Sequence, residues 1–186
     1  SNKDLIFKVA PGGTATEGYR MIGTSGPKHT FYGSVTTHLT GNSDPVSLSD
    51  NTGVGNVIYF GTGSTTLGLL YFLNTDGGWT AANANATGSL VNTGGGNASL
   101  LGMALGTSPL ANGMLIQGFF DATAAYSEGW VKGGAVYVIS GAAGDAGKIS
   151  GSAPTAADSY VRIVGYCTDT PNVIYFNPDS TWVENS

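Results

Sequence analysis

The sequence of 186 residues suits one domain, or one domain with an arm, and is long enough to bury a sizeable core. With 41% hydrophobic residues the chain is not disordered, and its 30 Gly and 10% charged residues favour short strands joined by tight turns. The net charge is −5, and the 7 Lys and Arg residues are scattered, which excludes direct nucleic-acid binding. No apolar run reaches the roughly 18–20 residues of a membrane span.

The N-terminal region differs in composition from the rest of the chain. It shows no basic segment followed by a long apolar run, so we expect no signal peptide and synthesis in a cytoplasm. Residues 1–30 are rich in Gly and Thr, contain Pro11 and Pro27, and have only isolated apolar groups. They suit either an extended arm that orders against a neighbouring subunit or an ordinary start to the domain. We predict an arm at residues 1–30 and a β domain at residues 31–186.

Short runs of β-branched and aromatic residues, bounded by Gly, Asn, Asp, Ser or Pro, predict about ten short strands. Residues 99–112 allow at most one helical turn, since Gly102, Gly106 and Pro109 argue against a helix. Without crossover helices, the strands predict an all-β fold, an antiparallel sandwich or barrel that is jelly-roll-like. The clearest runs lie at residues 5–10, 29–39, 56–60, 69–73, 114–120, 135–140, 160–167 and 172–176.

The second half of the chain contains an internal repeat. Each copy has a strand with a central Tyr, a Gly-rich turn, a long Thr/Ala/Ser-rich connection, a strand with a central Gly, a short turn and a last strand. Tyr71 precedes Gly102 by 31 residues, and Tyr137 precedes Gly165 by 28. One three-stranded unit is too small to bury its apolar face, whereas two can close a sandwich or barrel. The predicted copies occupy residues 63–120 and 133–184.

The word NVIYF occurs twice, at residues 56–60 and 172–176. By position in the repeat, the second occurrence corresponds to residues 114–120 and not to the first occurrence. The first occurrence is either a remnant of a further copy or an independent strand that meets the same demand for a buried β-branched and aromatic run, and we interpret both words as core strands.

Few residues suggest catalysis. Cys167 is the only cysteine, so no intrachain disulfide forms, and its place in a strand predicts a small buried residue. A catalytic thiol needs a His partner, and His29 and His38 lie far upstream. The sequence has no zinc spacing, nucleophile elbow or phosphate loop. We therefore predict no enzyme activity, no catalytic residues, no cofactor and no metal.

The acidic residues fall almost entirely in turn sequences. There a carboxylate caps its own turn, which we prefer over paired carboxylates for glycoside hydrolysis. Calcium binding by NTDGG or NPDS is an alternative with too few ligands. The residues considered are Asp44, Asp50, Asp76, Asp121, Asp145, Asp158, Asp169, Asp179, Glu17, Glu128 and Glu184.

Aromatic residues suggest a different kind of site. Trp79, Trp130 and Trp182, with nine Tyr, are candidates for sugar-stacking platforms. Trp182 lies in the terminal run DSTWVE, where covering the edge of the core is the simpler role.

Residues 133–184, with the runs AVYVIS, VRIVGYC and IYFNPDSTWVE, resemble a module of tailed-bacteriophage virion proteins. The module is a C-terminal segment of tail-fibre proteins, notably of marine phages and cyanophages. Residues 68–120 match it loosely, and the first sixty residues do not match it. The resemblance implies a β-rich structural protein of the virion that is oligomeric and often trimeric.

A tail fibre normally has a long shaft and a tail-attachment domain, and neither is present in this sequence. We therefore expect a capsid decoration (cement) protein on the capsid surface, a homotrimer that binds the major capsid protein through residues 1–26 and one face. The alternative is a tail-fibre or receptor-binding module that recognises a host glycan. A host-derived carbohydrate-binding module is a third possibility.

Overall fold

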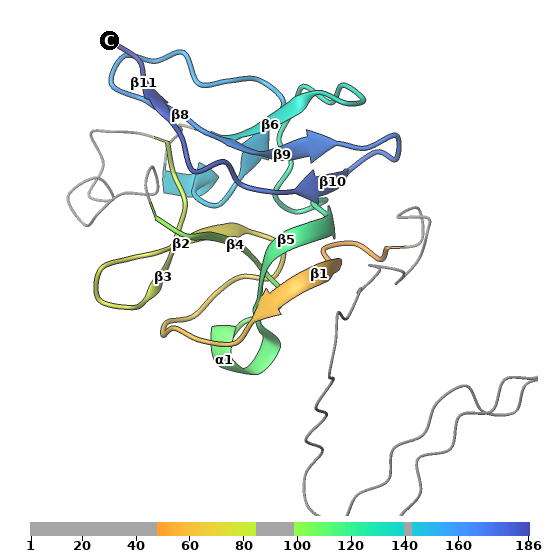
Figure 1. The fold of residues 1–186 in the computed structure, drawn as a ribbon, viewed down its shortest axis with the longest axis vertical. Coiled ribbons are helices and arrows are strands. Elements are labelled where there is room, and N and C mark those ends of the chain that lie inside the picture. Colours follow the sequence, from red (N-terminus) through yellow and green to blue (C-terminus); the bar gives the residue numbers. More distant parts are fainter. Residues whose placement is uncertain (1–47, 85–98, 140–142) are drawn as a thin grey trace, which may run out of the picture. The chain divides into compact units, whose positions relative to one another are not determined.

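The computed structural model describes residues 48–84, 99–139 and 143–186, which belong to one compact unit (Figure 1). The predicted arm, the predicted strands at 5–10 and 29–39, and both histidines lie outside these residues. In chain order the elements are β1 (Gly53–Ile58), β2 (Leu70–Leu73), β3 (Trp79–Ala81), β4 (Leu101–Ala104), α1 (Pro109–Asn112), β5 (Met114–Asp121), β6 (Ala135–Val138), the 3₁₀ turn η2 (Ala143–Asp145), β7 (Ile149–Ser150), β8 (Tyr160–Val161), β9 (Ile163–Cys167), β10 (Val173–Phe176) and β11 (Val183–Glu184).

Nine of the described strands form one sheet, in which the order is β3-β2-β4-β5-β10-β9-β6-β7 and β1 pairs with β5. The pairs within this sheet are antiparallel. β8 and β11 form a separate antiparallel ribbon. The prediction of an all-β antiparallel sandwich or barrel is confirmed.

The strand order is the same on both sides of the β5–β10 pair. Outward from this pair, one side reads β4, β2, β3 and the other reads β9, β6, β7. We call β2–β5 the first copy and β6, β7, β9 and β10 the second copy. Each copy has four strands, so the sequence interpretation of three strands missed β3 and β7.

The tyrosine and glycine of the repeat lie on neighbouring strands in both copies. Tyr71 pairs directly with Gly102. In the second copy Gly165 pairs with Val136, and Tyr137 is displaced because the register shifts between Val136 and Tyr137. A β-bulge inserts one residue and produces this kind of shift.

The sheet curls so that its two ends meet. The Leu70 N–H donates to the Gly147 carbonyl (2.8 Å), and the Gly147 N–H donates to the Ala82 carbonyl (2.7 Å). The Ala84 N–H donates to the Ile139 carbonyl (2.9 Å). These bonds join the end of the first copy to the end of the second, and the curled sheet faces itself as two layers (Figure 1).

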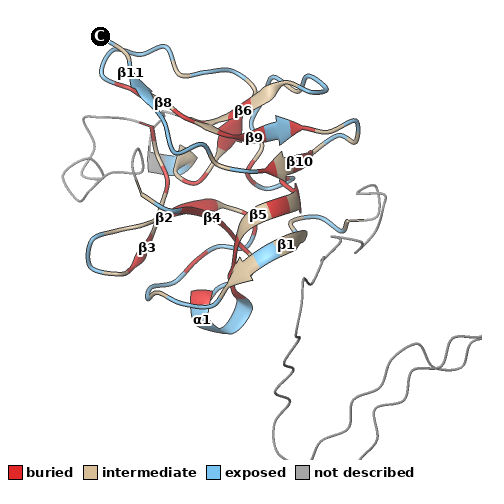
Figure 2. Cartoon of the chain, in the orientation of Figure 1, coloured by how far each residue is buried: buried red, intermediate tan, exposed pale blue. Residues whose placement is uncertain are grey.

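The core lies between the two layers (Figure 2). Both copies contribute to it, because alternate residues of each strand point inward. Each large apolar side chain that is fully buried there contributes about 1.5–3 kcal/mol. The buried residues are Leu70, Phe72, Ala82, Ala84, Leu101, Met103, Leu115, Phe120, Ala122, Ala125, Val136, Val138, Ile149, Val164, Cys167, Ile174 and Phe176.

A second, smaller cluster covers the outer face of the first copy. Tyr71 and Trp79 are only 6% and 4% exposed and pack with Ala104 and Met114. The Trp79 indole N–H donates to the Phe60 carbonyl (2.8 Å), and the Tyr71 hydroxyl accepts from the Thr66 N–H (2.7 Å). The segment after β1 therefore lies over this face.

Two local predictions have mixed outcomes. The one helical turn allowed within residues 99–112 is α1, where the Ser108 hydroxyl caps the turn and Pro109 begins it, a position that tolerates proline. The second NVIYF forms β10 and is largely buried. The core interpretation is wrong for the end of the first NVIYF, because β1 ends at Ile58 and leaves Tyr59 and Phe60 exposed.

Candidate binding surfaces

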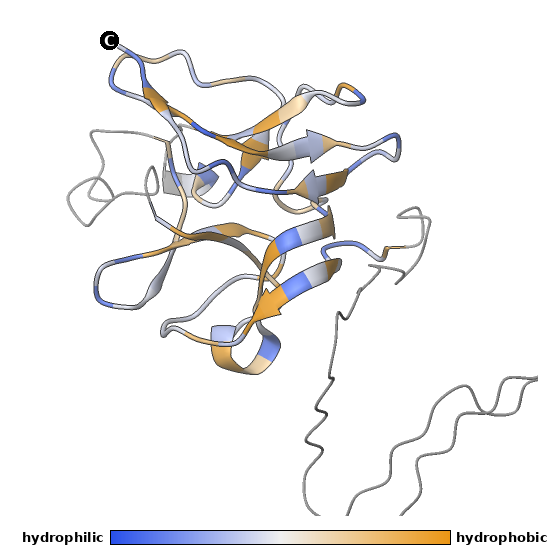
Figure 3. Cartoon of the chain, viewed as in Figure 1, coloured by the Kyte–Doolittle hydropathy of each residue, from blue (hydrophilic) through white to orange (hydrophobic). Residues whose placement is uncertain are grey.

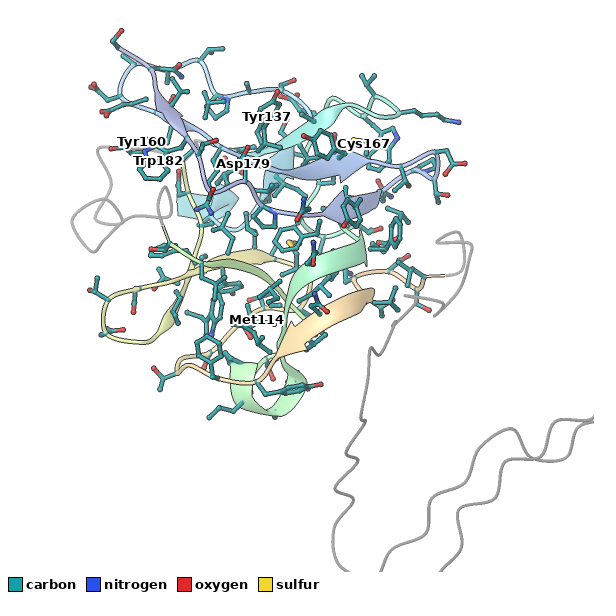
Figure 4. The ribbon with its side chains drawn as sticks, in the orientation of Figure 1. Met114, Tyr137, Tyr160, Cys167, Asp179 and Trp182 are labelled. Carbon is teal, nitrogen blue, oxygen red and sulfur yellow. The ribbon has the colours of Figure 1, made fainter. Side chains whose placement is uncertain are left out.

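The three tryptophans do not form one platform. Trp79 is a core residue. Trp130 packs on the core, edge-on to Tyr126 with ring centroids 5.0 Å apart, and its buried indole N–H has no partner among the described residues. Trp182 is 40% exposed and, with Tyr160, belongs to the end formed by β8 and β11 (Figure 4). The expectation that Trp182 covers the core edge stays a prediction.

Cys167 is buried in β9, as predicted. Its Sγ lies 3.6 Å from the hydroxyl of Tyr126. Burial, followed by the hydrogen bond and charge of Cys167, raises the pKa of Tyr126 far above its usual value. This contact keeps the phenol protonated and gives the thiol a structural role.

Carboxylates cap their own turns in the way the sequence indicates. The Asp76 carboxylate accepts from the Gly78 N–H (2.8 Å), and the Asp179 carboxylate accepts from the Thr181 N–H (3.0 Å). These bonds from Thr181 are the main reason that the pKa of Asp179 is lowered. Among the described residues, no group of three or more His, Cys, Asp or Glu side chains is placed to hold a metal.

Glu128 and Asp145 both line one hollow, which has a volume of about 420 Å³. The Asp145 carboxylate is paired with the Lys148 ammonium (3.3 Å). This pair is an i,i+3 ion pair at the surface, since the side chains of both residues are more than a third exposed.

Large apolar side chains are exposed around α1. A Cβ on Gly113, whose N–H bonds to α1, would lie 3.0 Å from the Tyr59 ring, and the Thr65 N–H donates to the Thr107 carbonyl just before α1 (3.1 Å). Figure 3 shows hydrophobic colour on part of α1 and on the end of β1. We name this surface the α1-end patch; it comprises Tyr59 (60% exposed), Phe60 (42%), Leu67 (42%) and Leu110 (62%).

The charged residues are distributed unevenly along the sequence. From residue 51 to residue 120 the sequence contains a single charged residue, Asp76. The C-terminal part carries the acidic residues that remain after this stretch. They are Asp121, Glu128, Asp145, Asp158, Asp169, Asp179 and Glu184.

An aromatic row crosses the outer face of the sheet beside the second copy. Phe119 pairs with Val54 on one side and with Tyr175 on the other, and Tyr175 pairs with Tyr166. The rings of Phe119 and Tyr175 are 5.4 Å apart and tilted, and Tyr166 is 44% exposed. We call the three aromatic residues, Phe119, Tyr175 and Tyr166, the aromatic row.

A ladder of side-chain amides runs beside the aromatic row. The Asn56 amide N–H donates to the Gln117 carbonyl oxygen (3.0 Å), and the Gln117 amide N–H donates to the Asn177 oxygen (3.1 Å). All three side chains lie at the surface. We name them the amide ladder.

The amide ladder borders a hollow of about 450 Å³. The start of β5 pairs with β4 and its end pairs with β10, and the hollow lies where the pairing partner changes. We call it the fork hollow. Leu101 and Ile116 are apolar lining residues, whereas Gln117, Asn177 and Ser180 are polar ones. Pockets of this size with an apolar lining and a few convergent polar groups are the usual small-ligand sites of proteins.

Arg162 forms part of the lining of the fork hollow and is only 6% exposed. Its Nε donates to the Asp179 carbonyl (2.9 Å), and its Nη1 donates to the Ser99 carbonyl (2.8 Å). Burial lowers the pKa of Arg162, and the nearby Asp179 carboxylate opposes this effect. The guanidinium therefore ties the connection after β10 to the residues before β4.

No family model, curated protein or solved structure matches this chain. Among the described residues, no helix has the length and apolar character that crossing a membrane requires. The fold and its surfaces are therefore the basis for any functional proposal.

Proposed function

We propose that this chain is a non-enzymatic structural protein of a phage virion, a decoration (cement) protein that binds the major capsid protein from outside. The observation that carries this proposal is the α1-end patch, four large apolar side chains on a part of the chain with almost no charge. The resemblance of residues 133–184 to a virion module supports the same class. Self-association as a homotrimer belongs to the proposal because that module is often trimeric.

The division of charge gives the molecule two ends with different chemistry. Burying an apolar patch against another protein is favourable by about 25 cal/mol per Å² and needs no charge to be desolvated. The acidic C-terminal part keeps the opposite end hydrated. Such a protein adds buried area across boundaries between capsid proteins and stabilises the shell by binding its assembled form.

A tail-fibre or receptor-binding module is the second candidate. The aromatic row, in which Tyr166 is 44% exposed, favours it, because tyrosines at a protein surface are typical of recognition sites. Copy number separates the two candidates. Hundreds of copies per particle, counted by quantitative gel analysis of purified virions, support cement, whereas a few dozen or fewer support a fibre.

Binding of purified chain to phage heads that lack it tests the role of the α1-end patch. We expect Leu110→Asp to weaken binding by at least about tenfold, because a charge would have to be desolvated in the interface. Val131→Asp is the matched control, since Val131 is 64% exposed and Leu110 is 62% exposed. Equal binding of both variants, or location of the chain on the tail, would overturn the proposal.

A further inference from the structure

We propose that the fork hollow and the adjoining aromatic row form a binding site for a neutral oligosaccharide. This goes beyond capsid binding and does not depend on it, because the site lies on β4, β5 and β10 and not at the α1-end patch. One sugar unit occupies the hollow, and the next lies over the row.

The polar lining matches the chemistry of sugar hydroxyls, which both donate and accept hydrogen bonds. Gln117 uses one amide N–H and one lone pair within the amide ladder, so a second N–H and a second lone pair remain. The Asn177 oxygen accepts from Gln117, while its amide nitrogen donates to no group among the described residues. Two amides that are held in place by each other therefore present donors and acceptors side by side.

The apolar lining matches the other property of a pyranose, its C–H faces. Leu101 and Ile116 line the hollow, and Leu100, which is 42% exposed, adds an apolar rim. The volume of about 450 Å³ lies within the range that small-ligand sites occupy.

The charges favour a neutral ligand over an acidic one. Among the described residues, Arg162 is the only cation that lines the hollow, and its Nε and Nη1 donate to the carbonyls of Asp179 and Ser99. The Asp179 carboxylate interacts electrostatically with Arg162 and so offsets part of the positive charge at this wall. The guanidinium thus shapes the wall, and neutral amides and hydroxyls remain to bind the ligand.

The aromatic row extends the site along the sheet. Tyr175 lies two residues before Asn177, and Phe119 lies two residues after Gln117, so each ring is on the same face as the neighbouring amide. Two residues along a strand span about 7 Å, which places the rings beside the hollow at the distance of a second sugar unit. An aromatic ring offers its face to the C–H groups of that unit.

Titration of the full chain with saccharides, followed by amide NMR shifts, tests the site. The probes are trisaccharides of glucose, galactose, mannose and N-acetylglucosamine, the corresponding monosaccharides, and a galacturonic acid trisaccharide. We expect at least one neutral trisaccharide to produce saturable shifts at Gln117, Asn177 and Tyr175. Gln117→Met and Ser180→Ala should each weaken binding of that trisaccharide. For Gln117→Met we expect the affinity to fall by about tenfold, because the substitution removes two hydrogen bonds without changing the shape of the side chain.

Tyr175→Ser separates the two parts of the site. It should weaken binding of the trisaccharide while leaving binding of the monosaccharide unchanged. Val131→Ala should change the affinity for neither saccharide. The proposal is overturned if no neutral saccharide gives saturable shifts, if the shifts lie away from the fork hollow, if the uronic acid binds more tightly, or if Gln117→Met and Ser180→Ala bind like the parent. Because the assay uses the isolated chain, its result is independent of binding to phage heads.

Discussion

The two copies share a strand order but differ in what lies over their outer faces. In the first copy the central tyrosine, Tyr71, is 6% exposed because the segment after β1 covers it. In the second copy Tyr137 is half-buried, and on the adjacent strand β9 Tyr166 is 44% exposed. The inner faces of both copies are alike, since they build one core.

This difference shows where a duplicated fold is free to change. Residues on the inner face must fit each other, because protein interiors are densely packed. Residues on the outer face are less constrained where no other segment of the chain covers them, so a binding surface can form there. The first copy places apolar side chains near α1, and the second copy lies beside the aromatic row and the fork hollow.

The largest expected effect on stability concerns the two glycines of the repeat, and it tests whether the two copies are structurally equivalent. A Cβ on Gly165 would overlap the Tyr175 carbonyl oxygen, a backbone atom, whereas a Cβ on Gly102 would meet Met114 Cβ at 3.2 Å and the Trp79 ring at 3.4 Å. We expect Gly165→Ala to lower the free energy of unfolding by about 3 kcal/mol or more, and Gly102→Ala by less than about 1.5 kcal/mol.

Urea unfolding of both variants measures the difference. Gly144→Ala is the control, because a Cβ there meets nothing within 4 Å. It should change stability by no more than about 0.5 kcal/mol. Equal losses at Gly102 and Gly165 would mean that the two copies tolerate a side chain alike.

Arg162 provides a smaller test, of the link between the copies. It donates to the Ser99 carbonyl before β4 and to the Asp179 carbonyl after β10. Arg162→Met should lower the free energy of unfolding by about 2–3 kcal/mol, since it leaves two partly buried carbonyl acceptors without their donors. Lys148→Met removes a surface ion pair and should cost less than about 1 kcal/mol. Thermal unfolding with indistinguishable losses for the two variants would contradict the linking role of Arg162.

Much of the fold could be predicted from the sequence, because runs such as LLYFL and NVIYF are strongly β-forming and are separated by clear turn residues. β3 and β7 were missed for a physical reason. They have three and two residues, too few for any alternation to appear, and only their partners β2 and β6 define them. The arm at residues 1–30 stays a prediction.

The candidate sites were less accessible to sequence reasoning. Asn56, Gln117 and Asn177 lie on or beside three different strands, and only the register brings them together. A slip of one residue would turn Gln117 toward the core, and no local pattern reveals the register. The available signal was Gln117 itself, the one amide within the apolar run MLIQGFF. Arg162 falls within the predicted strand run 160–167, but it lies between β8 and β9 and is buried.

The smallest expected effect concerns Tyr126, which lies in the connection between the copies and contacts Cys167 of the second copy. Its pKa is raised in the folded state, first by burial and then by Cys167. Above about pH 10 the unfolded chain releases the phenol proton while the folded chain keeps it, so this contribution to stability is full below about pH 10 and falls as the pH rises.

Tyr126→Phe removes the titrating group, so its unfolding free energy should decline less steeply than that of the parent between about pH 9 and about pH 11. Urea unfolding across this range measures the slope, and Tyr59→Phe, at a tyrosine that is 60% exposed, is the control. If the parent and Tyr126→Phe lose stability in parallel, the partly buried phenol does not hold its proton in the folded state, and the contact with Cys167 does not contribute to the pH dependence of stability.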